Sequence, residues 1–177
     1  MKILVISGSP HKNGTSATLV DQFIKGAEMS RHEVSRFDAA FKEVHPCIAC
    51  EKCHEGDSGC VFDDDMAELN PLLLSADAVV FAAPIYYYGM CSQIRTVIDR
   101  FYANDAALHT EKKTALLLTM ADGKFESAKG AVAAFENMAN FLGWKIAGKI
   151  VAMNCVDTNA LQSSPYPDQA YRLGMGI

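Results

Sequence analysis

The chain has 177 residues, of which 50% are hydrophobic and 21% charged, so it has the size and composition of one globular domain with a sizeable core. Its 16 Lys and Arg residues against 21 Asp and Glu residues give a net charge of −5, which argues against nucleic acid and anionic membranes as partners. The most apolar stretch, residues 72–85, is shorter than the ~20 residues of a membrane-spanning helix. Because the amino-terminal sequence lacks a signal-peptide pattern, we expect a cytoplasmic protein whose six cysteines are not paired in disulfides.

Short apolar runs alternate with helical patterns along the sequence. The apolar runs predict five strands, at residues 3–6, 33–38, 78–83, 115–118 and 149–153. Apolar residues at helical spacing predict helices over residues 15–29, 65–75, 94–102 and 128–142. Pro71 lies inside the second of these helices, which therefore either breaks into two short turns or begins near Pro71. The tail from Gln162 to Ile177 has little pattern, and either covers a neighbouring subunit or extends free.

This alternation predicts an α/β fold, because parallel strands need helical crossovers that cover both faces of the sheet. Five strands suit a flavodoxin-like or a small Rossmann-like doubly wound sheet, and both bind ligands at the carboxyl ends of the strands. The loops of interest are therefore residues 7–16, 84–91 and 119–127. We expect residues 1–177 to form a single domain that carries a cysteine-rich insert at about residues 45–64.

The loop after the first strand has the composition of a phosphate site. Between a buried strand and a helix start, backbone N–H groups and the positive end of the helix converge on one point. Ser9, Thr15 and Ser16 add hydroxyl groups, and neither a Walker A motif nor a G-x-G-x-x-G fingerprint is present. The alternative is an ordinary polar turn with a helix cap at Asn13 or Thr15.

The loop after the third strand contains three consecutive tyrosines, Tyr86, Tyr87 and Tyr88, followed by Gly89. Aromatic faces and exposed backbone amides suit a flat, amphipathic ring. The alternative is that tyrosines simply crowd the end of a strand. Together with a phosphate loop on the neighbouring strand, this loop predicts a ligand with one phosphate and one large planar ring.

Four cysteines of the insert form the compact motif C-x2-C-x2-C-x6-C: Cys47, Cys50, Cys53 and Cys60. Thiols at this spacing converge on a small volume, and as thiolates they would repel one another without a metal. The density of the motif favours a cubane iron–sulfur cluster, since zinc sites more often use separated C-x-x-C pairs. His45 and His54 are near enough to serve a zinc ion instead, and free thiols are a third alternative.

Other singled-out residues have structural interpretations. Asp65 and Glu68 have the spacing of a helix capping box. Cys91 and Cys155 stand outside the cysteine motif and are expected to be small buried hydrophobic residues. The sequence contains no Ser-His-Asp or paired-carboxylate arrangement, so it indicates no catalytic residue.

Three segments, GSPHKNGTS, APIYYYGM and SQIRTVIDRFY, resemble the flavodoxin-like NADPH-dependent FMN reductase family over residues 1 to about 155. The resemblance implies a sheet of order 2-1-3-4-5, non-covalently bound FMN, NAD(P)H as co-substrate, and a homodimer or homotetramer. It places around the FMN phosphate Ser9, His11, Asn13, Thr15 and Ser16. It places around the isoalloxazine ring Pro84, Ile85, Tyr86, Tyr87, Tyr88 and Gly89. In the third loop, residues 120–123 contain one glycine where relatives often carry two, which leaves Asp122 as the candidate contact there.

The cysteine motif is similar to that of the iron–sulfur flavoproteins, a branch of the same group, and this likeness implies a 4Fe–4S cluster that passes electrons from ferredoxin to FMN. Three functions follow from these observations. The first is an FMN-dependent NAD(P)H oxidoreductase that reduces a flavin, a quinone or another small acceptor. The second is an iron–sulfur flavoprotein electron carrier, and the third is a binding module with a structural zinc ion.

Overall fold

The computed structural model describes residues 1–55 and 59–177, whose centre is a twisted sheet. Its strands are β1 (Lys2–Ser7), β2 (Glu33–Asp38), β3 (Ala78–Tyr86), β4 (Gly89–Met90), β5 (Lys113–Thr119) and β6 (Lys145–Ala152). The order β2-β1-β3-β5-β6, with every pair parallel, confirms the flavodoxin-like arrangement of the five expected strands. The expected number of strands was too low, because β4 adds a sixth, antiparallel to the end of β3.

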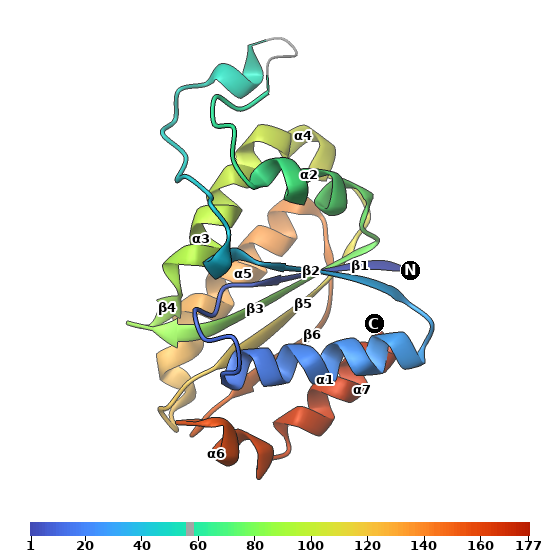
Figure 1. Cartoon of the computed structure of the whole chain (residues 1–177), viewed down its shortest axis with the longest axis vertical. Coiled ribbons are helices and arrows are strands. Elements are labelled where there is room, and N and C mark those ends of the chain that lie inside the picture. Colours follow the sequence, from blue (N-terminus) through green and yellow to red (C-terminus); the bar gives the residue numbers. More distant parts are fainter. Residues whose placement is uncertain (56–58) are drawn as a thin grey trace.

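Helices cover both faces of the sheet (Figure 1). One face carries α1 (Thr15–Met29) and α7 (Tyr166–Gly176), and the other carries α2 (Met66–Ser75), α3 (Ser92–Asp99) and α5 (Lys129–Leu142). The short helices are α4 (Asp105–Leu108) and α6 (Thr158–Gln162), with 3-10 helices at Ala39–Phe41, Lys52–His54, Arg100–Asn104 and Phe125–Ala128. None of the helices in the described residues is both long and apolar enough to cross a membrane.

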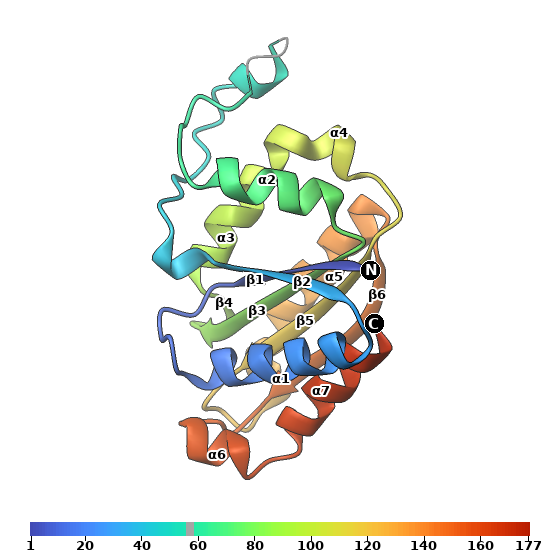
Figure 2. The ribbon, with the colours of Figure 1, turned by 45° about the vertical axis from the view of Figure 1, so that its right-hand side comes forward.

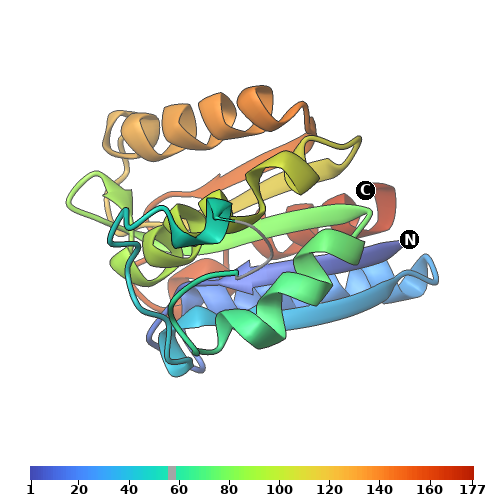
Figure 3. The ribbon, with the colours of Figure 1, turned by 90° about the horizontal axis from the view of Figure 1, so that it is seen from above.

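The side-chain alternation of the strands builds two cores. In β3, Val79 and Phe81 face the α2, α3 and α5 side, whereas Ala78 and Val80 face the α1 and α7 side. All four are completely buried, which explains why the strand sequence is a continuous apolar run rather than an alternating one. Figure 3 shows the layers on either side of the sheet.

The carboxyl-terminal tail is helical, which its weak sequence pattern did not predict. Helix α7 lies along α1 in Figures 1 and 2, at a close approach that glycines allow. A Cβ on Gly26 would lie 1.9 Å from the Tyr171 carbonyl oxygen, and one on Gly174 would lie 2.1 Å from that of Phe23. The tail therefore packs against its own chain and does not extend free.

Helix α2 also departs from two expectations. It is continuous from Met66 to Ser75 with Pro71 inside it, so it neither breaks into two turns nor begins near Pro71. Asp65 precedes the helix but its side chain caps nothing there, and its carboxylate accepts a 2.7 Å hydrogen bond from the Glu43 N–H instead. Because Glu68 pairs with Lys42, the expected capping box does not form.

The cysteine-rich insert lies between the 3-10 helix Ala39–Phe41 and α2. In Figures 1 and 2 it extends away from the sheet, beyond the ends of α2 and α4. Its regular structure in the described residues is limited to the 3-10 helix Lys52–His54. The cysteines are therefore carried by a segment that the main sheet does not cover.

Candidate functional site

Two of the three expected loops meet at the carboxyl edge of the sheet, where β1 and β3 end side by side. The Cys91 thiol donates a 3.0 Å hydrogen bond to the Gly8 carbonyl oxygen, and the Gly8 N–H donates a 2.8 Å bond to that of Ala82. A Cβ on Gly8 would lie 2.7 Å from the Cys91 sulfur, so only glycine permits this approach. The loop after β1 and the beginning of α3 are thereby held in contact.

The loop after β1 has the elements of an anion site. Helix α1 begins after Gly14, and no side chain in the described part of the chain caps it, so its first N–H groups have no capping partner there. Ser9 and Ser16 are buried at the base of the loop, whereas His11 and Asn13 are exposed. A hollow of about 550 Å³ is bordered by residues 10–15 and by Val156, Asp157 and Thr158. The alternative of a side-chain cap at Asn13 or Thr15 is excluded.

Thr119, at the end of β5, belongs to this loop although the sequence did not single it out. Its hydroxyl group lies 2.8 Å from that of Ser16 and accepts a 3.1 Å hydrogen bond from that of Thr15. All but 2% of Thr119 is buried, so its hydroxyl group has those of Ser16 and Thr15 rather than water as partners. More than a hundred residues separate Thr119 from Ser16 along the chain, and no local pattern could have linked them.

The three tyrosines form the tip of a two-residue hairpin between β3 and β4. Tyr87 and Tyr88 occupy its turn with φ values of 46° and 66°, in the left-handed region that this turn type requires and that glycine or asparagine usually fills. A non-glycine residue held there costs on the order of 1–3 kcal/mol, a strain that clusters at functional sites. Tyr86, Tyr87 and Tyr88 are all exposed, while Pro84 is buried and Ile85 and Gly89 are partly so.

The loop after β5 places Asp122 at the same edge but in a network of its own. The Asp122 carboxylate accepts hydrogen bonds from the Ser127 hydroxyl and from the Lys124 N–H, at 3.1 Å for the latter. The Ser127 hydrogen bond, then that from Lys124, lowers the pKa of Asp122. Asn154 supports the loop, because its N–H donates a 3.1 Å bond to the Asp122 carbonyl oxygen.

The four cysteines of the insert line one pocket: Cys47, Cys50, Cys53 and Cys60, together with residues of the 3-10 helix Arg100–Asn104. Burial, followed by the neighbouring Cys60 and Cys50 sulfurs, raises the pKa of Cys53. Within residues 1–55 and 59–177, no three His, Cys, Asp or Glu side chains lie close enough to hold a single metal ion. The described residues give the zinc alternative no support. The two histidines near the motif contact aromatic rings, since His45 stacks on Phe62 and His54 contacts Tyr102.

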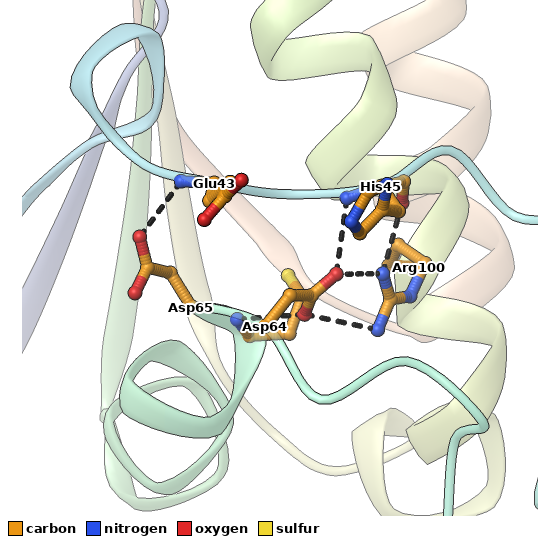
Figure 4. Close-up of polar contacts among 6 residues, drawn as sticks. Glu43, His45, Asp64, Asp65 and Arg100 are labelled. Carbon is orange, nitrogen blue, oxygen red and sulfur yellow. Dashed lines mark hydrogen bonds and ion pairs between the residues drawn. The ribbon is translucent and has the colours of Figure 1, made fainter.

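A buried ion pair joins the insert to the 3-10 helix (Figure 4). The Arg100 guanidinium donates to both oxygens of Asp64, at 2.6 and 3.2 Å, and its Nη1 also donates to the His45 carbonyl oxygen at 2.8 Å. Burial raises the pKa of Asp64, but hydrogen bonds from Arg100 and from the His45 and Met66 N–H groups outweigh it, so the pKa is lowered overall. Neither the role of Arg100 nor a partner for Asp64 was predicted from the sequence.

The cysteines outside the motif lie where they were expected. Cys91 and Cys155 are 2% and 5% exposed, and burial raises the pKa of both thiols. Both are therefore small buried residues that remain protonated.

Sequence relatives agree with this architecture. A family model described as NADPH-dependent FMN reductase matches residues 1–157. An iron-sulfur flavoprotein of Archaeoglobus fulgidus is 34% identical over 133 residues, which make up 73% of this chain and 60% of that protein. The chain therefore spans less than two thirds of this relative.

Solved structures with the same fold are more distant in sequence. A flavone reductase matches with a TM-score of 0.77 and 18% identity, over 99% of this chain and 61% of that one. The NAD(P)H:quinone oxidoreductase of Methanothermobacter marburgensis matches with a TM-score of 0.75 and 15% identity, over 99% and 96% of the two chains. Because the family model covers most of the sequence, the chain belongs to the NADPH-dependent FMN reductase family.

Proposed function

We propose that the protein is an FMN-dependent oxidoreductase that oxidises NAD(P)H and reduces a small-molecule acceptor such as a flavin or a quinone. The observation that carries this proposal is the contact between the phosphate-type loop and the segment that follows the tyrosine hairpin. That contact, between Gly8 and Cys91, brings an anion site and an aromatic site to one edge of the sheet. FMN has one phosphate and one planar ring, which such a pair of sites accommodates.

The residues fit this cofactor at both ends. The uncapped start of α1 and the buried hydroxyls of Ser9 and Ser16 would hold the phosphate, with His11, Asn13 and Thr15 at its rim. The hairpin residues 84–89 and Asp122 would border the ring. The chemistry that bound FMN supplies is acceptance of a hydride and transfer of its electrons, while the protein provides orientation and electrostatics.

Removing the buried hydroxyl groups tests the phosphate assignment. The double variant Ser9→Ala, Ser16→Ala should lower the affinity for FMN by at least tenfold and leave that for riboflavin nearly unchanged, because only FMN carries the phosphate. Ser30→Ala is a matched control at the other end of α1, where the hydroxyl donates to the Met175 carbonyl oxygen. Fluorescence titration with both flavins measures the ratio, and equal losses for FMN and riboflavin would contradict the assignment.

Turnover tests the reaction itself. The FMN-loaded protein should oxidise NADH or NADPH in the presence of a quinone or free flavin, and the protein without FMN should not. The rates of absorbance loss with NADH and with NADPH, measured separately, also determine which of the two cofactors is preferred. FMN binding without any nicotinamide oxidation would leave an electron carrier as the function of this site.

The four cysteines favour a second function, that of an iron–sulfur flavoprotein that receives electrons from ferredoxin. The supporting observation is that all four sulfur-bearing side chains border one pocket. A cubane cluster is held by four cysteine sulfurs, which lie farther apart than those around one zinc ion, and four cysteine side chains border this pocket. Cys47, Cys50, Cys53 and Cys60 would be its ligands.

Anaerobic reconstitution with iron and sulfide tests the cluster. We expect near-equal iron and sulfide contents and a broad charge-transfer absorption in the unaltered chain. Cys53→Ala should remove most of the iron and leave FMN bound, whereas Cys155→Ala, outside the pocket, should retain both. If the iron content of Cys53→Ala equals that of the unaltered chain, the cluster proposal is wrong.

We also propose that the chain forms a homodimer or homotetramer in the cytoplasm. The support is the strained, fully exposed hairpin tip, since Tyr87 has 101% of its reference exposure and Tyr88 has 68%. Large aromatic residues kept in the left-handed region at a protruding tip are typical of a surface that another molecule covers. Sedimentation velocity at micromolar concentration measures the mass, and a monomer with FMN bound would contradict the proposal.

A further inference from the structure

The pocket of the four cysteines has one wall that does not belong to the insert. Arg100 lines this pocket together with the cysteines and is 3% exposed, so its positive charge lies inside the protein. A buried guanidinium is costly unless its five N–H groups have acceptors. The contacts of Arg100 therefore indicate the role of this buried charge.

Most of these donors serve the two ends of the insert. Nη1 and Nη2 bind Asp64, four residues after the last cysteine, and Nη1 also binds the carbonyl oxygen of His45, two residues before the first. The guanidinium carbon lies 5.2 Å from the centre of the Phe62 ring, on which His45 stacks at 4.9 Å. One side chain thus joins both ends of the cysteine loop to the 3-10 helix, as Figure 4 shows for its polar contacts.

One of the three guanidinium nitrogens is left without a partner in the described part of the chain. The Arg100 Nε is buried and has no hydrogen-bond partner within residues 1–55 and 59–177. Asp64 cannot serve it, because its two oxygens already accept from Arg100, His45 and Met66. A buried donor without a partner is rare in proteins, and beside four thiols the acceptor that suits it is sulfur.

We propose that Arg100 is a positioning residue of the cysteine site, which fixes the loop through Asp64 and His45 and donates its Nε hydrogen to a sulfur of the bound cluster. This inference rests on the iron–sulfur site proposed above. Hydrogen bonds to the sulfurs and nearby positive charge both stabilise the more negative, reduced form of a cluster, and so raise its reduction potential. Arg100 would therefore set the potential at which the site accepts an electron.

Two variants separate this role from simple anchoring. Arg100→Lys keeps the positive charge but removes the planar fork and the Nε donor, so the potential should fall. Asp64→Asn removes the negative charge beside the guanidinium, so the potential should rise. Both loosen the loop and should speed iron loss to a chelator by about tenfold or more, as is usual when a group that supports a metal ligand is removed. A residue that only anchors the loop would speed iron loss in Arg100→Lys and leave the reduction potential of that variant unchanged.

The experiment is a redox titration of the anaerobically reconstituted, FMN-loaded full chain, followed by electron paramagnetic resonance. Arg95→Lys is the matched control, because Arg95 lies on α3, is half exposed and pairs with Asp99 instead of lining the pocket. Potentials of Arg100→Lys and Asp64→Asn that equal that of the unaltered chain would overturn the inference. If Arg100→Lys fails to fold or to retain iron, the reduction potential of Asp64→Asn tests the inference. A rise in this potential supports it, and no change or a fall contradicts it. If the unaltered chain takes up no iron, the cluster proposal itself is wrong. This result differs from unchanged potentials in variants that hold iron, which would contradict only the role of Arg100.

Discussion

Individual side chains at the carboxyl edge of the sheet explain how the loop after β1 holds its shape. Ser16 and Thr119 share a 2.8 Å hydrogen bond that joins the first turn of α1 to the end of β5. Gly8 allows the Cys91 sulfur to approach the loop from the other side. Ser9 and Ser16 were predicted from the sequence because hydroxyl groups near a helix start are a local signal. It missed Thr119, since its role depends entirely on the pairing of β5 next to β3.

Replacing Thr119 with valine tests this network. Thr119→Val preserves the shape but leaves the buried Ser16 hydroxyl short of a partner, which should lower the free energy of unfolding by ~1–3 kcal/mol. It should also weaken FMN binding relative to riboflavin binding, because the Ser16 hydroxyl loses its orientation.

Thr114→Val is the control for this experiment. Thr114 lies on the same strand, and its buried hydroxyl donates a 2.8 Å hydrogen bond to the Val79 carbonyl oxygen, near the other end of β5. Urea denaturation and flavin titration of both variants make the comparison. An unchanged FMN-to-riboflavin ratio in Thr119→Val would show that Thr119 supports the fold and not the site.

At the scale of whole elements, α1, α2, α3 and α5 followed from the sequence because their apolar residues recur at helical spacing, and five strands followed because they are short apolar runs. Helix α1 begins and ends at the residues that the pattern predicted. Helix α5 ends at Leu142, and Gly143 after it has a φ of 74°, the left-handed value of a helix terminus. Helix α7 was missed because small residues, Gly174 among them, replace an apolar stripe along much of its contact with α1. Such a contact has almost no hydrophobic signature, since it depends on how closely two backbones approach.

The glycine contact between α1 and α7 predicts a large effect from a small change. Gly174→Ala would place a Cβ 2.1 Å from the Phe23 carbonyl oxygen, so the helices must separate. We expect a loss of ~1–3 kcal/mol in the free energy of unfolding, as for other overpacked sites. Gly176→Ala is the control in the same helix, because no atom lies within 4 Å of the added Cβ and alanine favours helix. Thermal melting of the two variants checks this, and equal melting temperatures would contradict the close approach.

For the molecule as a whole, helix α3 and the 3-10 helix after it connect the two candidate sites. Cys91, just before α3, contacts the phosphate-type loop through Gly8, and Arg100 lines the cysteine pocket. The Arg100–Asp64 pair is the buried part of the attachment of the cysteine loop to this segment, beside the exposed hydrogen bond from the Tyr102 hydroxyl to Glu51. The stability of the molecule in acid should therefore depend on Asp64.

Acid unfolding measures this dependence. The folded chain lowers the pKa of Asp64, so the pair stabilises the protein fully above the unfolded value of ~4 and this contribution disappears as the pH falls through the lower folded value. Asp64→Asn should cost ~3–5 kcal/mol at pH 7, because it leaves a buried guanidinium without its counter-charge. The difference between the two proteins should shrink below pH 4, and a difference that is constant down to pH 2 would contradict this account.

Local information was sufficient for five of the strands, for α1, α2, α3 and α5, and for the position of the candidate loops, because each of these reflects the burial period or the composition of a short segment. The sheet order followed from the resemblance to a known family. The remaining features depend on contacts between segments that are distant in the sequence, so only the tertiary structure shows them. Thr119 reaches Ser16 across the sheet, α7 lies on α1 through glycines, and Arg100 meets Asp64 because α3 passes beside the insert. A side chain without an apolar period carries no sign of its partner, so such partners emerge only when the chain is folded.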